Sequence, residues 1–357
     1  MKKLIAVLMV LAMVLAFVGC AKEPAVEEPV AEGAAAEEAA DKIRLVYIIN
    51  GTLGDKSFFD SGKEGLDMIN EQYGDKFYTE VREMSYDSSV WESSAMDIAS
   101  EGWDIIVMGT WDMKATAAKI AEEYPETKVW YFDEQWDFEA SPVDNAYGML
   151  FAQNEGSYLV GMAAARASKT GKVAFMGGYE NTVLQDFAVG YAQGAKAVNP
   201  DIDVNVSWTQ SFDDVSIGKD ISLGLYQQGY DVVFSCCGNC GLGAFDAVVE
   251  MGEGYHVIGV DGNQGAYWES LGETAKAAAT ITSMQKNVNN AFLRAAGLHL
   301  EGTCPYGTNE TLGLAEGGVS FSVTDATKTI LGDEVIAEME KAQADIASGA
   351  IAVDTAF

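Results

Sequence analysis

The sequence contains few of the side chains and motifs on which catalysis usually depends. Only 2 of its 357 residues are histidines. It has no G-x-x-x-x-G-K-[ST] phosphate loop, no H-E-x-x-H metal motif and no G-x-S-x-G nucleophile elbow. The run "GNCGLG" (Gly238–Gly243) lacks the G-x-G-x-x-G spacing of a dinucleotide-binding turn. We therefore expect no catalytic residue and no cofactor, although an exported hydrolase that uses carboxylate pairs stays open as a minor alternative.

Basic residues are also scarce, since 22 Lys and Arg face 54 Asp and Glu and the formal net charge is -32. A chain this acidic repels phosphate backbones, so nucleic acid is not expected as a partner. The same charge is typical of a soluble exported surface and says little more about function.

The first 20 residues are typical of an export signal. Lys2 and Lys3 precede the apolar run Leu4–Val18, which is shorter than the roughly 20 residues of a membrane-spanning helix. "FVGC" then resembles the bacterial lipobox, apart from the bulky Phe17, and predicts cleavage before Cys20 and lipid attachment to it. We expect residues 1–19 to be a lipoprotein signal peptide, with an ordinary signal peptide and an incidental Cys20 as the alternative.

The next segment, residues 20–42, is dominated by Ala, Glu, Pro and Gly and could not form a core. It is predicted to be a flexible acidic tether. The expected location is the outer side of the cell membrane, reached through the lipid.

Among the four further cysteines, two have the C-x-x-C spacing, and there is no second pair of this kind. A structural zinc site usually needs four ligands, so no metal is expected. A disulfide between Cys304 and one of the other three stays open, as do free thiols. The three are Cys236, Cys237 and Cys240.

Short apolar runs alternate with amphipathic stretches of helical length, and the alternation occurs twice. This rhythm predicts two doubly wound α/β lobes with parallel sheets. The expected strands are 43–49, 77–85, 104–109 and 127–132, then 172–176, 204–208, 231–234 and 256–260. The expected helices are 57–72, 90–100 and 113–124, then 156–168, 183–198, 216–228 and 243–251.

Ligands in such folds bind beyond the carboxyl ends of the strands. The segments at these positions are rich in Gly, Asp, Asn and aromatic residues, which suits close backbone approach, ring stacking and recognition of polar edges. The first of them is "NGTLGDKSFFD" (residues 50–60), and Trp111 and Trp136 are expected at the same edge of the cleft. A plain turn with a helix cap is the alternative for residues 50–60.

Ten pieces of sequence, in order, resemble the basic-membrane-protein family of substrate-binding lipoproteins, in its purine-nucleoside-receptor-like branch. They are "GTLGDKSF", "AEEYPETKVWYFD", "GKVAFMGG", "FAVGYAQGAKAVNPDIDV", "SFDDVSIGK", "QQGYDVVF", "GNCGLG", "VIGVDGNQ", "TSMQK" and "GLAEGGV". The resemblance implies a type I periplasmic-binding fold with a hinge and a cleft between the lobes. Lobe 1 is expected at 43–147 plus about 264–304, and lobe 2 at 148–263 plus about 305–357.

The resemblance also implies the residues that hold a nucleoside. Phe58 would stack on the base, with Phe187 or Phe234 as the second ring, and Asp133 would contact the base. Asp261 and Lys286 would hold the ribose, and the loop around Gly238 would present backbone amides. Ordinary core packing for the rings, and a structural salt bridge for the charged pair, are the alternatives.

Two positions depart from the pattern of nucleoside binders. Ile49 stands where the first strand usually ends in Asp, and Phe59 stands where Asn usually follows "DKSF". Losing polar contacts changes selectivity, and Asn50 and Asp55 are candidates to compensate. A purine nucleoside is the first expectation, and a flavin-like or other sugar-bearing solute is the alternative.

The implied partners are a small solute and the permease and ATPase subunits of an ABC importer, with the protein acting as a monomer. A receptor that reports to a chemosensor is the other alternative for a protein of this kind.

Overall fold

The computed structural model describes residues 41–357. The predicted signal peptide, Cys20 and nearly all of the predicted tether lie outside these residues. Between residues 41 and 357, no helix has the length and apolar character that crossing a membrane would require.

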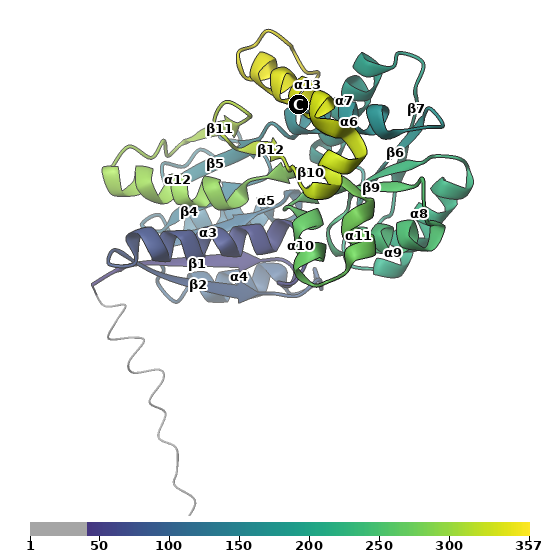
Figure 1. The fold of residues 1–357 in the computed structure, drawn as a ribbon. Coiled ribbons are helices and arrows are strands. Elements are labelled where there is room, and N and C mark those ends of the chain that lie inside the picture. Colours follow the sequence, from purple (N-terminus) through teal and green to yellow (C-terminus); the bar gives the residue numbers. More distant parts are fainter. Residues whose placement is uncertain (1–40) are drawn as a thin grey trace, which may run out of the picture. The chain divides into compact units, whose positions relative to one another are not determined.

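The described chain forms two six-stranded sheets, one in each lobe (Figure 1). The first has the strand order β11-β5-β4-β3-β1-β2 and is parallel throughout. The second has the order β12-β10-β9-β8-β6-β7, in which only β12 runs antiparallel. Two doubly wound α/β lobes are therefore confirmed.

The first sheet is built from two parts of the chain. Its strands are β1 (Ile43–Ile49), β2 (Phe77–Glu83), β3 (Ile105–Gly109), β4 (Lys128–Phe132), β5 (Ala146–Phe151) and β11 (Thr308–Leu312). Helices α3 (Phe58–Tyr73) and α12 (Val288–Glu301) pack on one face, and α4 (Trp91–Ala99) and α5 (Lys114–Glu123) pack on the other, with the short turn η1 (Trp111–Met113) after β3.

The second sheet follows the same plan. Its strands are β6 (Lys172–Gly177), β7 (Asp203–Trp208), β8 (Val232–Cys236), β9 (His256–Asp261), β10 (Thr280–Lys286) and β12 (Val319–Phe321). Helices α6 (Gln153–Ala167) and α7 (Thr182–Val198) pack on one face. The other elements of this lobe are α8 (Val215–Gln227), η2 (Gly238–Gly241), α9 (Leu242–Met251), α10 (Gln264–Ser270), α11 (Thr274–Ala279) and α13 (Asp325–Ala347).

Burial on both faces explains the continuous apolar strands. In β1, Leu45, Tyr47 and Ile49 belong to the cluster under α3 and α12, whereas Val46 and Ile48 belong to the cluster under α4 and α5. Successive side chains of a strand point to opposite faces, so neither face of this strand can be polar. Every strand and helix predicted before residue 261 is present within three residues of its expected ends.

The chain crosses between the lobes three times, and the crossings correct the predicted lobe boundaries. It passes from β5 to α6, from β10 to α12, and from β11 to β12. Residues 264–286 therefore belong to the second lobe, not the first, and β11 at 308–312 belongs to the first lobe, not the second. The sequence shows no clear strand or helix pattern after residue 261, so the predicted lobe boundaries in that part of the chain are wrong.

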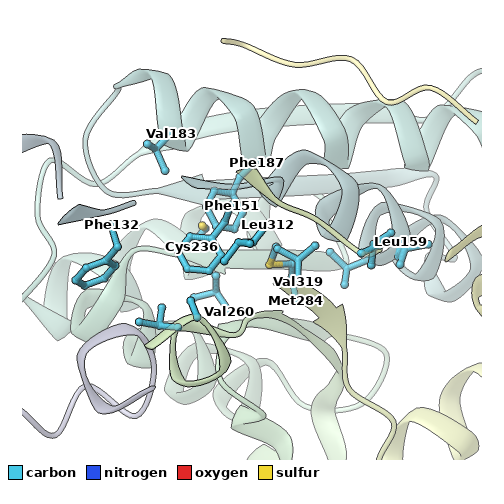
Figure 2. Packing of buried hydrophobic residues seen from close by; sticks show 14 of the residues in the cluster. Phe132, Phe151, Leu159, Val183, Phe187, Cys236, Val260, Met284, Leu312 and Val319 are labelled. Atoms are coloured by element: carbon cyan, nitrogen blue, oxygen red, sulfur yellow. The ribbon is translucent and has the colours of Figure 1, made fainter. Parts of the chain in front are cut away.

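One apolar cluster joins the lobes at the crossings (Figure 2). It contains Phe151 and Leu312 from the first sheet together with Met284 and Val319 from the second. Because this packing is shared, we expect any movement of the lobes to turn about these segments, which keep their contacts, while the far side of the cleft opens.

Candidate functional site

A cavity of about 120 Å³ lies where the carboxyl ends of the two sheets face each other. Its polar and charged lining is Asn50, Asp55, Thr110, Asp112, Asp133, Asp261 and Lys286, and its other lining residues are Phe58, Phe59, Tyr86, Trp91, Trp111, Val183, Leu184, Phe187, Phe212, Cys236 and Gly238. The volume is below the roughly 300–1,000 Å³ of typical ligand sites. A nucleoside-sized solute would therefore require the lobes or the side chains to move apart.

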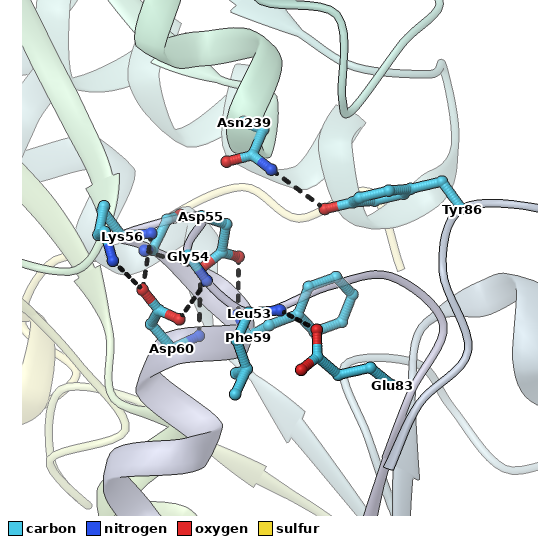
Figure 3. A network of polar contacts seen from close by, with 10 residues as sticks. Leu53, Gly54, Asp55, Lys56, Phe59, Asp60, Glu83, Tyr86 and Asn239 are labelled. Atoms are coloured by element: carbon cyan, nitrogen blue, oxygen red, sulfur yellow. Dashed lines mark hydrogen bonds and ion pairs between the residues drawn. The ribbon is translucent and has the colours of Figure 1, made fainter. Parts of the chain in front are cut away.

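The loop after β1 is held by its own carboxylates (Figure 3). Asp55 accepts hydrogen bonds from the backbone N–H groups of Ser57 (3.1 Å), Phe59 (2.8 Å) and Asp60 (3.1 Å). Asp60 in turn accepts from the N–H groups of Gly54 (2.7 Å) and Lys56 (3.0 Å). Because Asp55 caps the first turn of α3, its direct effect is to position the two phenylalanines that follow.

Asn50 and Asp55 are the candidates to compensate for the polar groups that Ile49 and Phe59 replace. Asn50 donates to the hydroxyl of Thr110 at 2.9 Å, and both residues line the cavity. Burial raises the pKa of Asp55 to about 6, although its three N–H partners oppose the rise. Ile49 is fully buried in the core and does not line the cavity, whereas Asn50 and Asp55 do.

Lys286 and Asp133 form an ion pair that joins the lobes, from the end of β10 to the end of β4. Lys286 is 2% exposed. Burial alone would lower its pKa, but Asp133 and Asp261 more than offset that effect, so the pKa of Lys286 is raised and the ammonium stays charged. Burial raises the pKa of Asp133 while Lys286 lowers it.

Asp261 makes the second contact between the lobes by accepting a hydrogen bond from the Ser57 hydroxyl at 2.8 Å. Its pKa is raised to about 7, chiefly by burial, against the opposing effects of Lys286 and Ser57. The alternative of a salt bridge between Asp261 and Lys286 is not what the structure shows. Lys286 pairs with Asp133, and Asp261 accepts from Ser57. Each of these contacts joins residues of opposite lobes across the cleft.

Three phenylalanines lie near the same ammonium: Phe151, whose ring centre is 5.6 Å from the nitrogen, and two that line the cavity from opposite lobes. The nitrogen of Lys286 lies 5.7 Å from the ring centre of Phe58 and 4.7 Å from that of Phe187. Phe58 stacks on Phe132 behind it, with centres 5.3 Å apart and planes at 28°, and Phe59 meets Phe58 edge-on. These rings give the cavity aromatic surface from both lobes, as base stacking requires.

The structure corrects the placement of two other aromatic residues. Phe234 is completely buried among Phe175, Phe187 and Tyr191 and does not line the cavity, because its side chain points into the packed face under α7. Phe187 is therefore the better candidate for the second ring. Trp136 is buried against Tyr131 and Phe138, away from the cavity, whereas Trp111 lines it and is 42% exposed.

The cysteines are free thiols in the described chain. Cys304 follows α12 in the first lobe, whereas Cys236 ends β8, Cys237 follows it and Cys240 lies in η2, all in the second lobe, so no disulfide joins Cys304 to any of them. Gly238 lines the cavity with φ +56°, a conformation that favours glycine. Within residues 41–357 no group of three or more His, Cys, Asp or Glu residues is arranged to hold a metal ion.

Unfavourable backbone conformations gather at the ends of the strands around the cavity. Thr110, Asp133 and Asp261 all have positive φ, at 74°, 70° and 61°. Each such residue is costly and persists where surrounding structure enforces it, often at ligand sites. Since all three line the cavity, the strain supports its interpretation as the site.

Several lining residues were missed by the sequence analysis, among them Tyr86, Trp91, Asp112 and Phe212. Tyr86 comes after β2 and receives a 3.4 Å hydrogen bond from Asn239 of the opposite lobe (Figure 3). The strand-end rule that identified residues 50–60 applies equally to the segments after β2 and β7, and would have found Tyr86 and Phe212.

The comparisons with known proteins agree with this architecture. The family model described as "ABC transporter substrate-binding protein PnrA-like" matches residues 42–356. Basic membrane protein A of Borreliella burgdorferi is 32% identical over 78% of this chain and 78% of its own length. An ABC transporter nucleoside-binding protein, BmpA of Lactococcus lactis, is 30% identical over 87% of this chain and 88% of its own length.

The matched share of the relatives' own length varies. The match to basic membrane protein A1 of Borrelia garinii spans 64% of that protein, slightly under two thirds. Among solved structures, an ABC solute-binding protein from Aeropyrum pernix has a TM-score of 0.76 at 25% identity and covers 88% of this chain and 93% of that one. A periplasmic solute-binding protein from Actinobacillus succinogenes with bound D-allose has a TM-score of 0.61 at 15% identity, covering 81% and 100%. These likenesses confirm the type I periplasmic-binding fold.

Proposed function

Because the chain belongs to the PnrA-like family of ABC transporter substrate-binding proteins, we propose that it binds a nucleoside-like solute in the cavity between its lobes and delivers it unchanged to a membrane permease. The observation that carries the proposal is the meeting of rings and charges from both lobes at one cavity. Phe58 and Asp133 come from the first lobe, and Phe187, Asp261 and Lys286 come from the second.

Each residue has a role that its chemistry suits. The rings of Phe58 and Phe187 cover the faces of a planar base, and Asp133 accepts from its polar edge. Asp261 accepts hydrogen bonds from the ribose hydroxyls, and Lys286 donates to their oxygens. No bond of the solute is broken, so the protein acts as a receptor and not as an enzyme.

A solute that contacts both lobes binds the closed form more tightly than the open form. Binding therefore shifts the population towards closure by that difference in affinity. The closed form would then dock on the permease, whose ATPase subunits drive transport. Lipid attached to Cys20 would hold the receptor at the outer side of the cell membrane, and this anchor belongs to the proposal.

Calorimetric titration with adenosine tests the proposal, together with one variant in each candidate ring. The wild type should bind one adenosine per chain. Phe187→Leu should weaken binding by about 1–1.5 kcal/mol, because it removes a stacked ring while keeping apolar volume.

Phe234→Leu is the matched control, since it makes the same change in the neighbouring core. It should lower the free energy of unfolding while leaving the adenosine affinity close to that of the wild type. Absence of binding by the folded wild type to adenosine, guanosine and inosine would contradict the proposed function. Weaker binding only in Phe234→Leu would transfer the stacking role to that residue.

A further inference from the structure

The carboxylates in the cavity outnumber the ammonium groups, and one of them has no partner. The lining holds Asp55, Asp112, Asp133 and Asp261 against Lys286 alone. Three of the four carboxylates are engaged, by backbone N–H groups, by the ammonium and by a hydroxyl respectively. The side chain of Asp112 makes no hydrogen bond or ion pair with any residue of the described chain, so its charge is available to a group of the solute.

The position of Asp112 shields its carboxylate partly from solvent. It lies in η1, directly after β3, and is partly buried. Burial raises its pKa to about 6, and no donor or cation acts in the opposite direction. Lys114, two residues further along the chain, pairs with Glu134 at 3.6 Å, and Lys286 pairs with Asp133.

Aromatic residues form much of the same wall of the cavity. Trp111 precedes Asp112 in the chain and is 42% exposed, and Trp91 and Tyr86 from the segment after β2 also line the cavity. The faces of indole and phenol rings attract cations, and they do so more strongly where water is excluded. A carboxylate beside such rings is a suitable setting for a positively charged group.

We propose that the cavity selects a solute that carries a protonated amine or another cationic group, which the Asp112 carboxylate pairs and the Trp111 ring covers. This inference rests on the proposed function, because it takes the cavity as the solute site. It also implies that phosphorylated solutes are rejected, since their charge has the same sign as that of the unpaired carboxylate.

A neutral solute with several hydroxyl groups could also donate to Asp112. The balance of the lining favours a cation, because hydroxyl groups would leave the excess of carboxylates over ammonium groups in place. Charge-assisted bonds are also stronger than neutral ones. The two cases differ in a measurable way, since only recognition of a cation makes affinity depend on the charge of otherwise similar solutes.

The test compares probes that share one nucleoside frame and differ in charge. Adenosine is neutral, 5′-amino-5′-deoxyadenosine carries its cation on the sugar, 1-methyladenosine carries it on the base, and adenosine 5′-monophosphate is an anion. Affinities are measured by calorimetry at neutral pH. At least one cationic probe should bind about tenfold or more tighter than adenosine, and the monophosphate should bind more weakly than adenosine.

The variant Asp112→Asn should reduce the ratio of cationic to neutral affinity to within roughly threefold. The control Asp97→Asn removes the same charge from an exposed position of α4 outside the cavity and should keep the wild-type ratio. If adenosine binds and neither cationic probe binds more tightly, or if Asp112→Asn keeps the preference, the inference is overturned while the proposed function stands. If no probe binds the folded wild type, both fail.

Discussion

Replacing Lys286 by methionine is expected to abolish measurable adenosine binding and to lower the free energy of unfolding by about 3–5 kcal/mol at pH 7.5. Methionine keeps most of the apolar stem but leaves the buried Asp133 carboxylate without the ammonium that it contacts across the cleft. Chemical denaturation and calorimetry measure the two effects. The loss of stability should shrink at acidic pH, because protonating Asp133 removes the unpaired charge.

The double variant Lys286→Met/Asp133→Asn separates the two effects. Asparagine tolerates the positive φ at position 133 and removes the orphaned charge, so most of the lost stability should return. Binding should not return, because the ammonium donor to the sugar is gone and the amide at position 133 lacks the negative charge with which the carboxylate accepts from the base. A Lys286→Met protein that binds adenosine with wild-type affinity would remove Lys286 from the site.

Replacing Asp261 by asparagine is expected to weaken adenosine binding by about 1.5–3 kcal/mol, the range for a hydrogen bond to a charged group. The same change should also alter the stability of the protein without solute. Compared with the wild type at the same pH, the variant should be more favoured at pH 8 than at pH 5. Burial is the main cause that raises the pKa of Asp261 to about 7, against an ordinary value of 3.8. The folded state therefore holds this proton more tightly than the unfolded chain does.

The sign of the pH effect follows from linkage. Between about pH 4 and pH 7 the folded state binds the extra proton, so the contribution of Asp261 to the free energy of unfolding falls as pH rises through this window. Asparagine does not titrate, so the variant should lack this part of the slope. Denaturation curves at pH 5 and pH 8 test this, and a variant that is less stable than the wild type at pH 8 by as much as at pH 5 would contradict it.

Only Asp261→Asn shows a conflict between binding and stability, because Lys286 stabilises the empty protein through its ion pair with Asp133, whereas the buried Asp261 carboxylate costs the empty protein stability as pH rises. Asp261 and Lys286 are buried charged groups whose pKa values are shifted by their surroundings. Perturbed groups of this kind gather at functional sites. A residue such as Asp261, which costs the empty protein stability and contributes affinity, is expected where the solute takes the place of contacts between the lobes.

The sequence predicted the fold well because the buried parallel strands are visible as apolar runs. β1 and β8 are nearly free of polar residues since helices cover both faces of each sheet. The sequence indicated less clearly which segments after residue 261 belong to which lobe. β10 ends in the polar run "TSMQK", and β11 reads "TNETL", so neither shows the apolar pattern of a core strand.

The site was predicted in part for a similar reason. Asp133 and Asp261 directly follow or end their strands, so the strand-end rule and the family motifs both pointed to them. Asp112 carries no motif, and its lack of a partner is visible only in three dimensions. Phe187 and Phe234 could not be separated by sequence, because both lie in apolar segments and only the packing shows which ring reaches the cavity.

Mass spectrometry of the small molecule that the natively purified protein releases on denaturation tests the central claim most directly. The account predicts one intact solute per chain, with a nucleoside-like mass and no phosphate, and its absence from Lys286→Met protein prepared in the same way. Release of a free base and a free sugar, or an equal amount of the same molecule from the variant, would contradict binding in this cavity without chemistry.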